Sequence, residues 1–457
     1  MQNKFNKITW AVAIAAAAFA SQANAGGYQI NEQSVSGQGY GHAGRSSNVN
    51  DATIVFGNPA GMSFLDRAQL TAGGTYLNVN SRIRNVESER TGVVTMGGVP
   101  IGATSESVDG TNDGDMVPGT LIPFAFYAQP VNERLAFGFG VYAPFGSKTD
   151  YEGGFEGRNQ GNYTEVRVIS AQPTVSYRFN DQWAVGAGIT YNRVNGELQR
   201  QVPVALPDGM GGANITELDA RVEGDDDNWG YNLGVIFQPV PETTLGLTYR
   251  SKVSYTLTGD FRATATDASL GVPEGTVVRE DNASLDLTTP ETVNFSVTQQ
   301  MSDNLKLMAG ASWTRWSRFE RILVEGETSE DPITLEQQNY SNAWAFAVGG
   351  EYQLNPQLAL RAGVTIDNTP TNDATRSVRI PSDDRRIFSI GAGWTPMENL
   401  TLDVAYSYLT ERGTHVDQTK TDTRELQPGV VSQVTSSYSA DYKNEAHGFG
   451  AQLTYRF

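Results

Sequence analysis

The side chains best suited to acid–base chemistry at neutral pH are three histidines, His42, His415 and His447. A Ser-His-acid hydrolase on the outside of a membrane protein needs a histidine beside a serine, and His447 is the residue placed to serve there. The sequence has no G-x-S-x-G elbow, P-loop, H-E-x-x-H or EF-hand pattern in its required context. We therefore predict that the protein is not an enzyme, with a His447-dependent phospholipase as the alternative.

Two acidic runs, Asp225-Asp226-Asp227 and Asp383-Asp384, have the right chemistry to hold Ca²⁺ or to bridge lipopolysaccharide through divalent ions. Such runs are more often solvated parts of a loop. The chain has no cysteine, which excludes disulfides and thiolate metal sites. Its formal charge of −18 makes nucleic acid an unsuitable partner. We predict no metal and no cofactor.

Residues 1–25 have the pattern of a secretory signal peptide. Lys4 and Lys7 precede a short apolar run at residues 8–20, and Ala23-Asn24-Ala25 fits a cleavage site for small residues. The apolar run is shorter than the roughly 20 residues that cross a bilayer as a helix. We predict an exported protein; the alternative is that this run forms a buried helix of the mature chain.

The rest of the chain alternates in polarity as amphipathic strands do. Between residues 134 and 142, the large apolar side chains Leu135, Phe137, Phe139 and Val141 alternate with alanine and glycine. Six short turns rich in Pro, Asn and Asp follow strands of this kind, at residues 130–133, 180–182, 239–242, 302–304, 355–357 and 396–399. Seven long polar loops are expected at residues 81–118, 145–162, 200–227, 262–284, 326–338, 371–382 and 413–438.

Thirteen connections join fourteen strands, beginning with residues 68–80. We predict an all-β protein, a fourteen-stranded antiparallel transmembrane β-barrel with short periplasmic turns and long outer loops. In the last strand, Phe449, Leu453, Tyr455 and Phe457 share one face, which we expect to contact lipid. A soluble β-sandwich of two domains is the alternative.

The segment before the first strand is too rich in Gly, Ser and Asn to bury a core of its own. A lumen of fourteen strands is too wide for side chains of the wall alone to fill. We therefore predict that residues 26–67 form an N-terminal hatch that plugs the barrel of residues 68–457. The turn Asn58-Pro59-Ala60 would lead the chain back to the wall, or it simply marks a domain junction.

Several fragments, in this order, resemble the FadL family of long-chain fatty acid transporters of Gram-negative outer membranes. They are GYQINEQSVSGQGYGHAG from Gly27, GNPAG from Gly57, LTYRS from Leu247, WTRWS from Trp313 and RIPSDDR from Arg379. The resemblance extends over the whole mature chain and implies passive uptake of long-chain fatty acids by a monomer. It also implies contact with outer-membrane lipid and lipopolysaccharide, and recognition of the terminal Phe457 by the barrel assembly machinery.

The resemblance implies that apolar outer loops capture the ligand. Val202, Val204 and Leu206 stand in a loop that should be hydrated, where exposed apolar residues mark a ligand site. The same residues could instead pack the loops against each other. An inner pocket would then be formed by barrel side chains and by the start of the hatch, at Gly26, Gly27, Tyr28 and Ile30.

A carboxylate taken into an apolar channel needs a cation nearby. In the strand that begins at Trp183, odd-numbered residues are expected to face lipid and even-numbered residues to face inward. Arg200 then turns inward if the alternation continues that far, and the FadL family has an inward basic residue near this place. An arginine solvated at the rim is an equally good interpretation.

Pro144 cannot donate a ladder hydrogen bond, so it marks a break or the end of the third strand. In FadL-like barrels this strand kinks inward and opens a lateral hole towards the membrane. The resemblance therefore implies that Pro144-Phe145-Gly146 and the hatch turn Asn58-Pro59-Ala60 take part in gating. Some relatives of the FadL family carry monoaromatic hydrocarbons, so such a hydrocarbon is the alternative cargo. A general porin is a further alternative for the function of the barrel.

Overall fold

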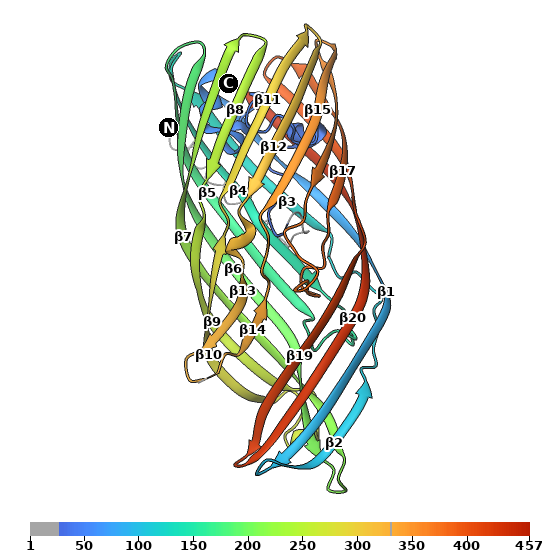
Figure 1. The fold of residues 1–457 in the computed structure, drawn as a ribbon. Helices are drawn as coiled ribbons and strands as arrows, with labels where there is room; N and C mark the ends of the chain where they lie inside the picture. Colours follow the sequence, from blue (N-terminus) through green and yellow to red (C-terminus); the bar gives the residue numbers. More distant parts are fainter. Residues whose placement is uncertain (1–26, 330) are drawn as a thin grey trace.

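Figure 1 shows the computed structural model, an elongated barrel of β-strands. The structure describes residues 27–329 and 331–457, so the predicted signal peptide and Gly26 lie outside the described residues. Within these ranges, no helix combines the length and the apolar character that a membrane crossing requires.

Fourteen strands form the wall of the barrel, each antiparallel to its two neighbours, and the ring closes between the first and the last of them. They are β1 (Gln69–Met96), β3 (Thr120–Pro130), β4 (Leu135–Asp150), β5 (Tyr163–Arg178), β6 (Trp183–Pro207), β7 (Ala213–Val240), β8 (Thr243–Arg250), β11 (Thr292–Ser302), β12 (Leu305–Thr314), β15 (Ala343–Asn355), β16 (Leu358–Asp367), β17 (Arg385–Met397), β18 (Leu400–Glu411) and β20 (Val430–Arg456). The predicted fourteen-stranded antiparallel barrel is confirmed.

The six predicted short turns all join wall strands at one end of the barrel, the upper end in Figure 1. We call it the short-turn end; the C-terminus also lies there. Asparagine closes several of these turns. In the turn after β5, the Asn180 side chain accepts hydrogen bonds from the backbone N–H groups of Gln182 and Trp183, each at 2.9 Å.

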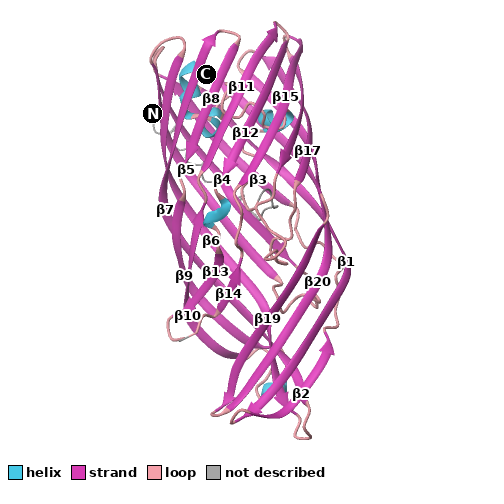
Figure 2. Cartoon of the chain, in the orientation of Figure 1, coloured by secondary structure: helices cyan, strands magenta, loops and turns pink. Residues whose placement is uncertain are grey.

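At the opposite end, the segments predicted as long polar loops are instead paired strands for much of their length. The strands run on as tall hairpins, which Figure 2 shows as magenta arrows at its lower end, and we call this the long-hairpin end. β1 continues to Met96 rather than ending near residue 80, and β6 and β7 pair as far as Pro207 and Ala213. Shorter elements join them here: β2 (Val99–Ser107), β9 (Val253–Ala265), β10 (Val277–Thr289), β13 (Arg321–Gly326), β14 (Thr334–Gln337), β19 (Thr414–Gln427), η2 (Ala268–Leu270) and η3 (Trp316–Arg318).

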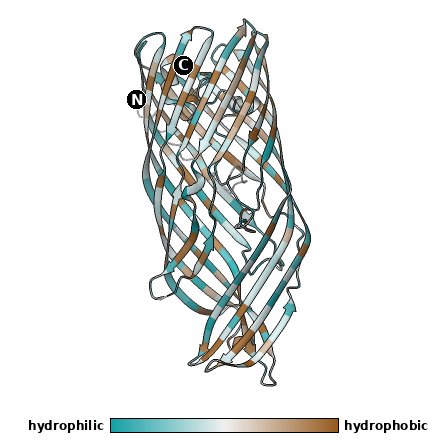
Figure 3. Ribbon diagram, in the orientation of Figure 1, coloured by the Kyte–Doolittle hydropathy of each residue, from teal (hydrophilic) through white to brown (hydrophobic). Residues whose placement is uncertain are grey.

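The wall strands alternate in exposure as their sequences predict. In β6, Ile189 is exposed, whereas its neighbours Thr190 and Asn192 are buried. In β20, Phe449 and Leu453 face outward while Gln452 and Thr454 are buried. Brown, apolar residues alternate with paler ones along the strands of the short-turn half in Figure 3. The outward apolar face is the one expected to contact lipid.

Residues 27–67 lie inside the barrel near the short-turn end, drawn in blue in Figure 1. They form α2 (Val35–Gly39), α3 (Ile54–Gly57) and η1 (Pro59–Phe64). Their polar groups bond to the wall: the Ser46 hydroxyl donates to the carbonyl of Gly246 at 2.9 Å, and Val35 N–H donates to the Gln452 side chain at 2.9 Å. The segment thus occupies lumen space with its polar groups satisfied by the wall.

The turn at Asn58-Pro59-Ala60 brings this segment against β7. The Asn58 side chain accepts a hydrogen bond from Ala60 N–H at 3.0 Å and donates to the carbonyl of Val235 at 3.0 Å. A Cβ added to Gly234 would lie 2.0 Å from Asn58 Oδ1, so the close approach requires a glycine in the wall. Proline at the first position of η1 suits the start of a helix, where its missing N–H is not needed.

Candidate functional site

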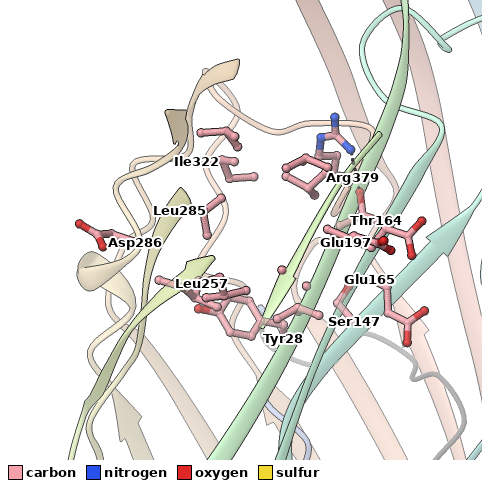
Figure 4. A pocket seen from close by; sticks show the side chains of 18 of the residues that line it. Tyr28, Ser147, Thr164, Glu165, Glu197, Leu257, Leu285, Asp286, Ile322 and Arg379 are labelled. Atoms are coloured by element: carbon pink, nitrogen blue, oxygen red, sulfur yellow. Dashed lines mark hydrogen bonds between the residues drawn. The ribbon is translucent and has the colours of Figure 1, made fainter. Parts of the chain in front are cut away.

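An apolar cavity, which we call the inner pocket, lies at mid-height between the barrel wall and the shorter strands of the long-hairpin end (Figure 4). It holds about 830 Å³ of space between atoms, part of it open to solvent. Leu257, Leu285 and Ile322 give it an apolar side, and Asp286 points away from it in Figure 4. The further apolar lining comes from Val166, Leu198, Val222, Leu287, Phe319, Val324 and Ile380.

Tyr28, at the start of the N-terminal segment, reaches the wall of the inner pocket. It is buried in a cluster of aromatic rings: its ring centroid lies 4.7 Å from that of Trp316, 5.5 Å from Phe319 and 5.9 Å from Phe145. Edge-to-face pairs at these distances add to the stability that burial alone gives. Gly27 packs on the Trp316 ring, whereas Ile30 lies outside this pocket.

The same few residues of the N-terminal segment pair with β4 at its proline. Gln29 lies opposite Phe145 in an antiparallel bridge. Ile30 N–H donates to the carbonyl of Pro144 at 2.9 Å, and Gly146 N–H donates to the carbonyl of Tyr28 at 2.7 Å. The structure thus brings together the two segments predicted to line the pocket and to gate it.

The wall is interrupted beside this junction. The ladder between β3 and β4 runs only from Pro130–Ala136 to Ala125–Val141, and the register of β4 against β5 shifts between Tyr142 and Phe145. Ile30 packs with Ile122 of β3 and Ala143 of β4 where this ladder ends. A side chain of the N-terminal segment therefore covers the place where two wall strands stop pairing.

Two arginines line the inner pocket: Arg379 is buried, whereas Arg321 is exposed. The Nε of Arg379 lies 3.0 Å from Glu336 Oε2, and its Nη1 donates to the hydroxyl of Thr164 at 2.9 Å (Figure 4). Glu336 Oε1 also accepts a hydrogen bond from Lys420 Nζ at 2.6 Å. Burial alone would raise the pKa of Glu336, but Arg379 and Lys420 together hold that pKa at about 2. The carboxylate is therefore charged at any physiological pH.

Arg200 is turned inward, as the alternation along β6 predicts, but it does not line the inner pocket. Its guanidinium is held by Asp422, at 2.5 Å from Nη2 to Oδ1 and 3.0 Å from Nη1 to Oδ2. Arg193 is exposed on the outer face and pairs with Asp225 at 2.8 Å. The buried cation next to the inner pocket is thus Arg379, which no spacing in the sequence singles out, because its partner Glu336 lies 43 residues away.

A second cavity, the outer vestibule, lies further towards the long-hairpin end, where Arg200 and Val202 line it. It holds about 1740 Å³ of space between atoms, part of it open to solvent. Leu198, Val222 and Arg379 line both this vestibule and the inner pocket, so the two cavities adjoin. Of the other apolar residues predicted to bind ligand, Val204 is buried in the core and Leu206 packs against it.

A third cavity lies between the N-terminal segment and the wall, and its lining is more polar than that of the inner pocket. Glu32, His42 and Arg45 line it together with serines and threonines of the wall. Arg45 Nη1 donates to the Asn31 side chain at 2.8 Å. Apolar ligands gain little by entering a cavity of this chemistry, because its polar groups would lose hydration.

Neither His447 nor His415 forms a hydrolase site that a substrate could enter. His447 Nδ1 lies 2.8 Å from the Tyr406 hydroxyl rather than beside a serine. His415 lies 2.9 Å from Asp441 and 3.4 Å from the Ser439 hydroxyl, but on the exposed face of a hairpin and outside the three cavities described above. In the part of the chain that the structure describes, no three His, Cys, Asp or Glu residues are grouped as metal ligands.

The chain is similar to known proteins over nearly its whole length. Residues 16–457 match the family model described as outer membrane protein transport protein (OMPP1/FadL/TodX). Outer membrane protein P1 of Haemophilus influenzae is 29% identical, over 99% of this chain and 100% of its own length. The long-chain fatty acid transport protein of Escherichia coli O6:H1 is 24% identical, over 98% of each chain.

Solved structures agree with the barrel. A FadL homologue of Pseudomonas aeruginosa has a TM-score of 0.78 and 26% identity, over 95% of this chain and 100% of its own. The toluene transporter TodX of P. putida has a TM-score of 0.61 and 16% identity, over 92% and 99%, and shares the fold.

Proposed function

The chain belongs to the OMPP1/FadL/TodX family of outer membrane transport proteins, and from that premise we propose that it takes up long-chain fatty acids. Membership makes it a transporter of hydrophobic compounds in the outer membrane of a Gram-negative bacterium, and not an enzyme. The identity of the cargo as a fatty acid and its route through the protein are the parts that we propose. In this proposal, residues 26–67 are a hatch, residues 68–457 are the barrel, and the short-turn end faces the periplasm.

The observation that carries the proposal is the apolar inner pocket with one buried arginine, Arg379, in its wall; the other arginine of its lining, Arg321, is exposed. A fatty acid has a long apolar chain and one carboxylate, and these are the two kinds of contact that the pocket offers. An apolar lining with a few polar groups is the usual composition of a small-molecule site. A bidentate arginine–carboxylate pair is among the strongest polar contacts available to such a ligand.

The proposed route has three steps. The ligand first enters the outer vestibule, where Val202 and other apolar side chains meet it, and then moves past Leu198 and Val222 into the inner pocket. Tyr28 and Ile30 next leave Pro144-Phe145-Gly146, and the ligand exits sideways between β3 and β4. A sideways exit keeps it away from the polar cavity beneath the hatch.

A second candidate cargo is a monoaromatic hydrocarbon, and one observation favours it. Arg379 is already ion-paired with Glu336, and Arg200 is already ion-paired with Asp422. A neutral ligand needs no exchange of carboxylates, so an apolar pocket with a satisfied arginine suits it as well.

Native mass spectrometry of the purified mature protein separates these candidates. The protein is incubated with oleate or with toluene in a neutral detergent, and the bound mass is read. We expect one oleate to be retained. Toluene retained without oleate would give the hydrocarbon first place, and retention of neither ligand would overturn the proposal.

A further inference from the structure

The charge of the outer vestibule is opposite to that of the protein. The chain has 51 acidic and 33 basic residues. Among the described residues that line the vestibule, six are basic and two are acidic. They are Arg200, Arg221, Arg279, Arg379, Lys420 and Arg424 on one side, and Asp331 and Asp422 on the other.

Four of the six basic side chains form ion pairs with three carboxylates. Arg200 pairs with Asp422, Arg221 with Glu197, and both Arg379 and Lys420 with Glu336. Arg279 and Arg424 form no ion pair with any residue that the structure describes. Arg279 instead donates to the Ser329 hydroxyl and lies 5.4 Å from the centre of the Phe261 ring.

Arg424 is held in position by the strand that carries it. It follows Lys420 and Asp422 on the inward face of β19, where every second residue is turned to the vestibule. Burial and the charge of Arg279 both lower the pKa of Arg424.

Arg279 of β10 and Arg424 of β19 thus line one space, close enough for the charge of Arg279 to act on Arg424. Asp281 offsets part of the charge of Arg279, because it accepts a hydrogen bond from the Ser329 hydroxyl to which Arg279 donates. An anion between the two arginines would stabilise them further.

The rest of the vestibule defines what kind of anion fits. Its lining includes the apolar side chains Val202, Leu218, Phe261, Ile333 and Leu335, and it adjoins the apolar inner pocket. A ligand that satisfies both parts carries one anionic head group on an apolar chain. Both arginines line the vestibule, where Arg424 is half-buried and Arg279 is exposed.

We propose that Arg279 and Arg424 form an anion-binding site in the outer vestibule, which takes the carboxylate of a single-chain amphiphile before its chain enters the inner pocket. The site deepens the proposed function and rests on it. It makes capture selective for charged amphiphiles, whereas an apolar groove alone would take hydrocarbons equally well. Lys420 and Arg379 continue the line of cations from this site towards the inner pocket.

The test follows the rate at which dodecanoate reaches the inner pocket, read from tryptophan fluorescence because Trp316 contacts Tyr28 at the pocket wall. We expect the association rate to fall about three- to tenfold in an Arg279→Gln/Arg424→Gln variant, in line with one or two charge-assisted contacts. Dodecanol, which has the same chain without the charge, should load equally fast in both proteins. Raising the salt concentration should slow dodecanoate in the wild type only.

Two controls make the result specific. Arg193→Gln removes an exposed cation from the outer face of the wall and should leave the rate unchanged. The Arg279→Lys/Arg424→Lys variant keeps both charges and should therefore keep part of the association rate that the glutamine variant loses. Unchanged dodecanoate loading in the glutamine variant, with oleate still retained in mass spectrometry, would overturn the site while leaving the proposed function intact. A wild type that retains no fatty acid would overturn the function itself.

Discussion

At the scale of single residues, Glu336 competes with any carboxylate that approaches Arg379. It is buried, ionised and bound to both Arg379 and Lys420. Glu336→Gln keeps the size of the side chain and removes its charge, which leaves two cations to be satisfied. We expect oleate to bind about tenfold more tightly to this variant, and toluene to bind as before. Titration of both ligands in neutral detergent measures this; equal changes for the two would contradict a role for charge.

Lys420 gives the loading of anions a dependence on pH. Burial lowers the pKa of Lys420 from its usual 10.5 to about 8, in spite of Glu336. The ammonium is therefore present below pH 8 and is lost as the pH rises above it, while dodecanoate stays ionised. We expect dodecanoate loading to slow about two- to threefold between pH 7 and pH 9. A Lys420→Met variant should load slowly at both pH values; a wild-type rate that is flat with pH would refute this.

Gly27 lets the chain turn onto Trp316. Its φ of +71° is one that side chains rarely adopt, and an added Cβ would lie 2.6 Å from Trp316 Cζ2. We expect Gly27→Ala to weaken the docking of Tyr28 and Ile30 by about 1–2 kcal/mol. The measurement is faster hydrogen exchange at Ile30 and Gly146 N–H. Gly97→Ala is the matched control, because Gly97 also has a positive φ but has nothing within 4 Å of the added atom; equal effects of the two would deny the contact a role.

At the scale of elements, the sequence predicts those parts of the strands that lie inside the bilayer. Inside a bilayer, one face of each strand is apolar and the other is small or polar, so the alternation in β4, β6 and β20 is visible. Beyond the bilayer, both faces are polar, and a paired hairpin looks like a loop. This is why β1 extends to Met96 although its pattern indicated an end near residue 80.

The site could be predicted less completely, because its contacts join distant segments. The alternation along β6 gave the inward direction of Arg200, but its partner Asp422 lies 222 residues away and was not predictable. The same holds for Arg379 and Glu336. The resemblance predicted that the start of the N-terminal segment lines the pocket. In the structure, Tyr28 lies against the inner pocket and Gln29 lies opposite Phe145.

At the scale of the whole molecule, we propose that the N-terminal segment plugs this barrel. Its residues fill the lumen near the short-turn end and bond to strands around the ring, such as β8 and β20. We expect a very small single-channel conductance in planar bilayers, unlike that of an open porin. Deletion of residues 26–65 should raise it several-fold, provided that the variant still runs as a folded barrel in unheated gels. A large conductance of the intact protein would contradict the plug.

The most direct test of the account is whether the start of the hatch must leave β4 for transport. Gln29 and Phe145 are bridged without mutual hydrogen bonds, a geometry close enough for a disulfide, and the chain has no cysteine of its own. The measurement is uptake of labelled oleate by cells that carry a Gln29→Cys/Phe145→Cys variant, in its oxidised and its reduced form. The two single-cysteine variants are the controls. If this segment must leave β4, the oxidised protein still binds oleate but does not deliver it, and reduction restores uptake. Equal uptake by the oxidised and reduced forms would contradict that requirement.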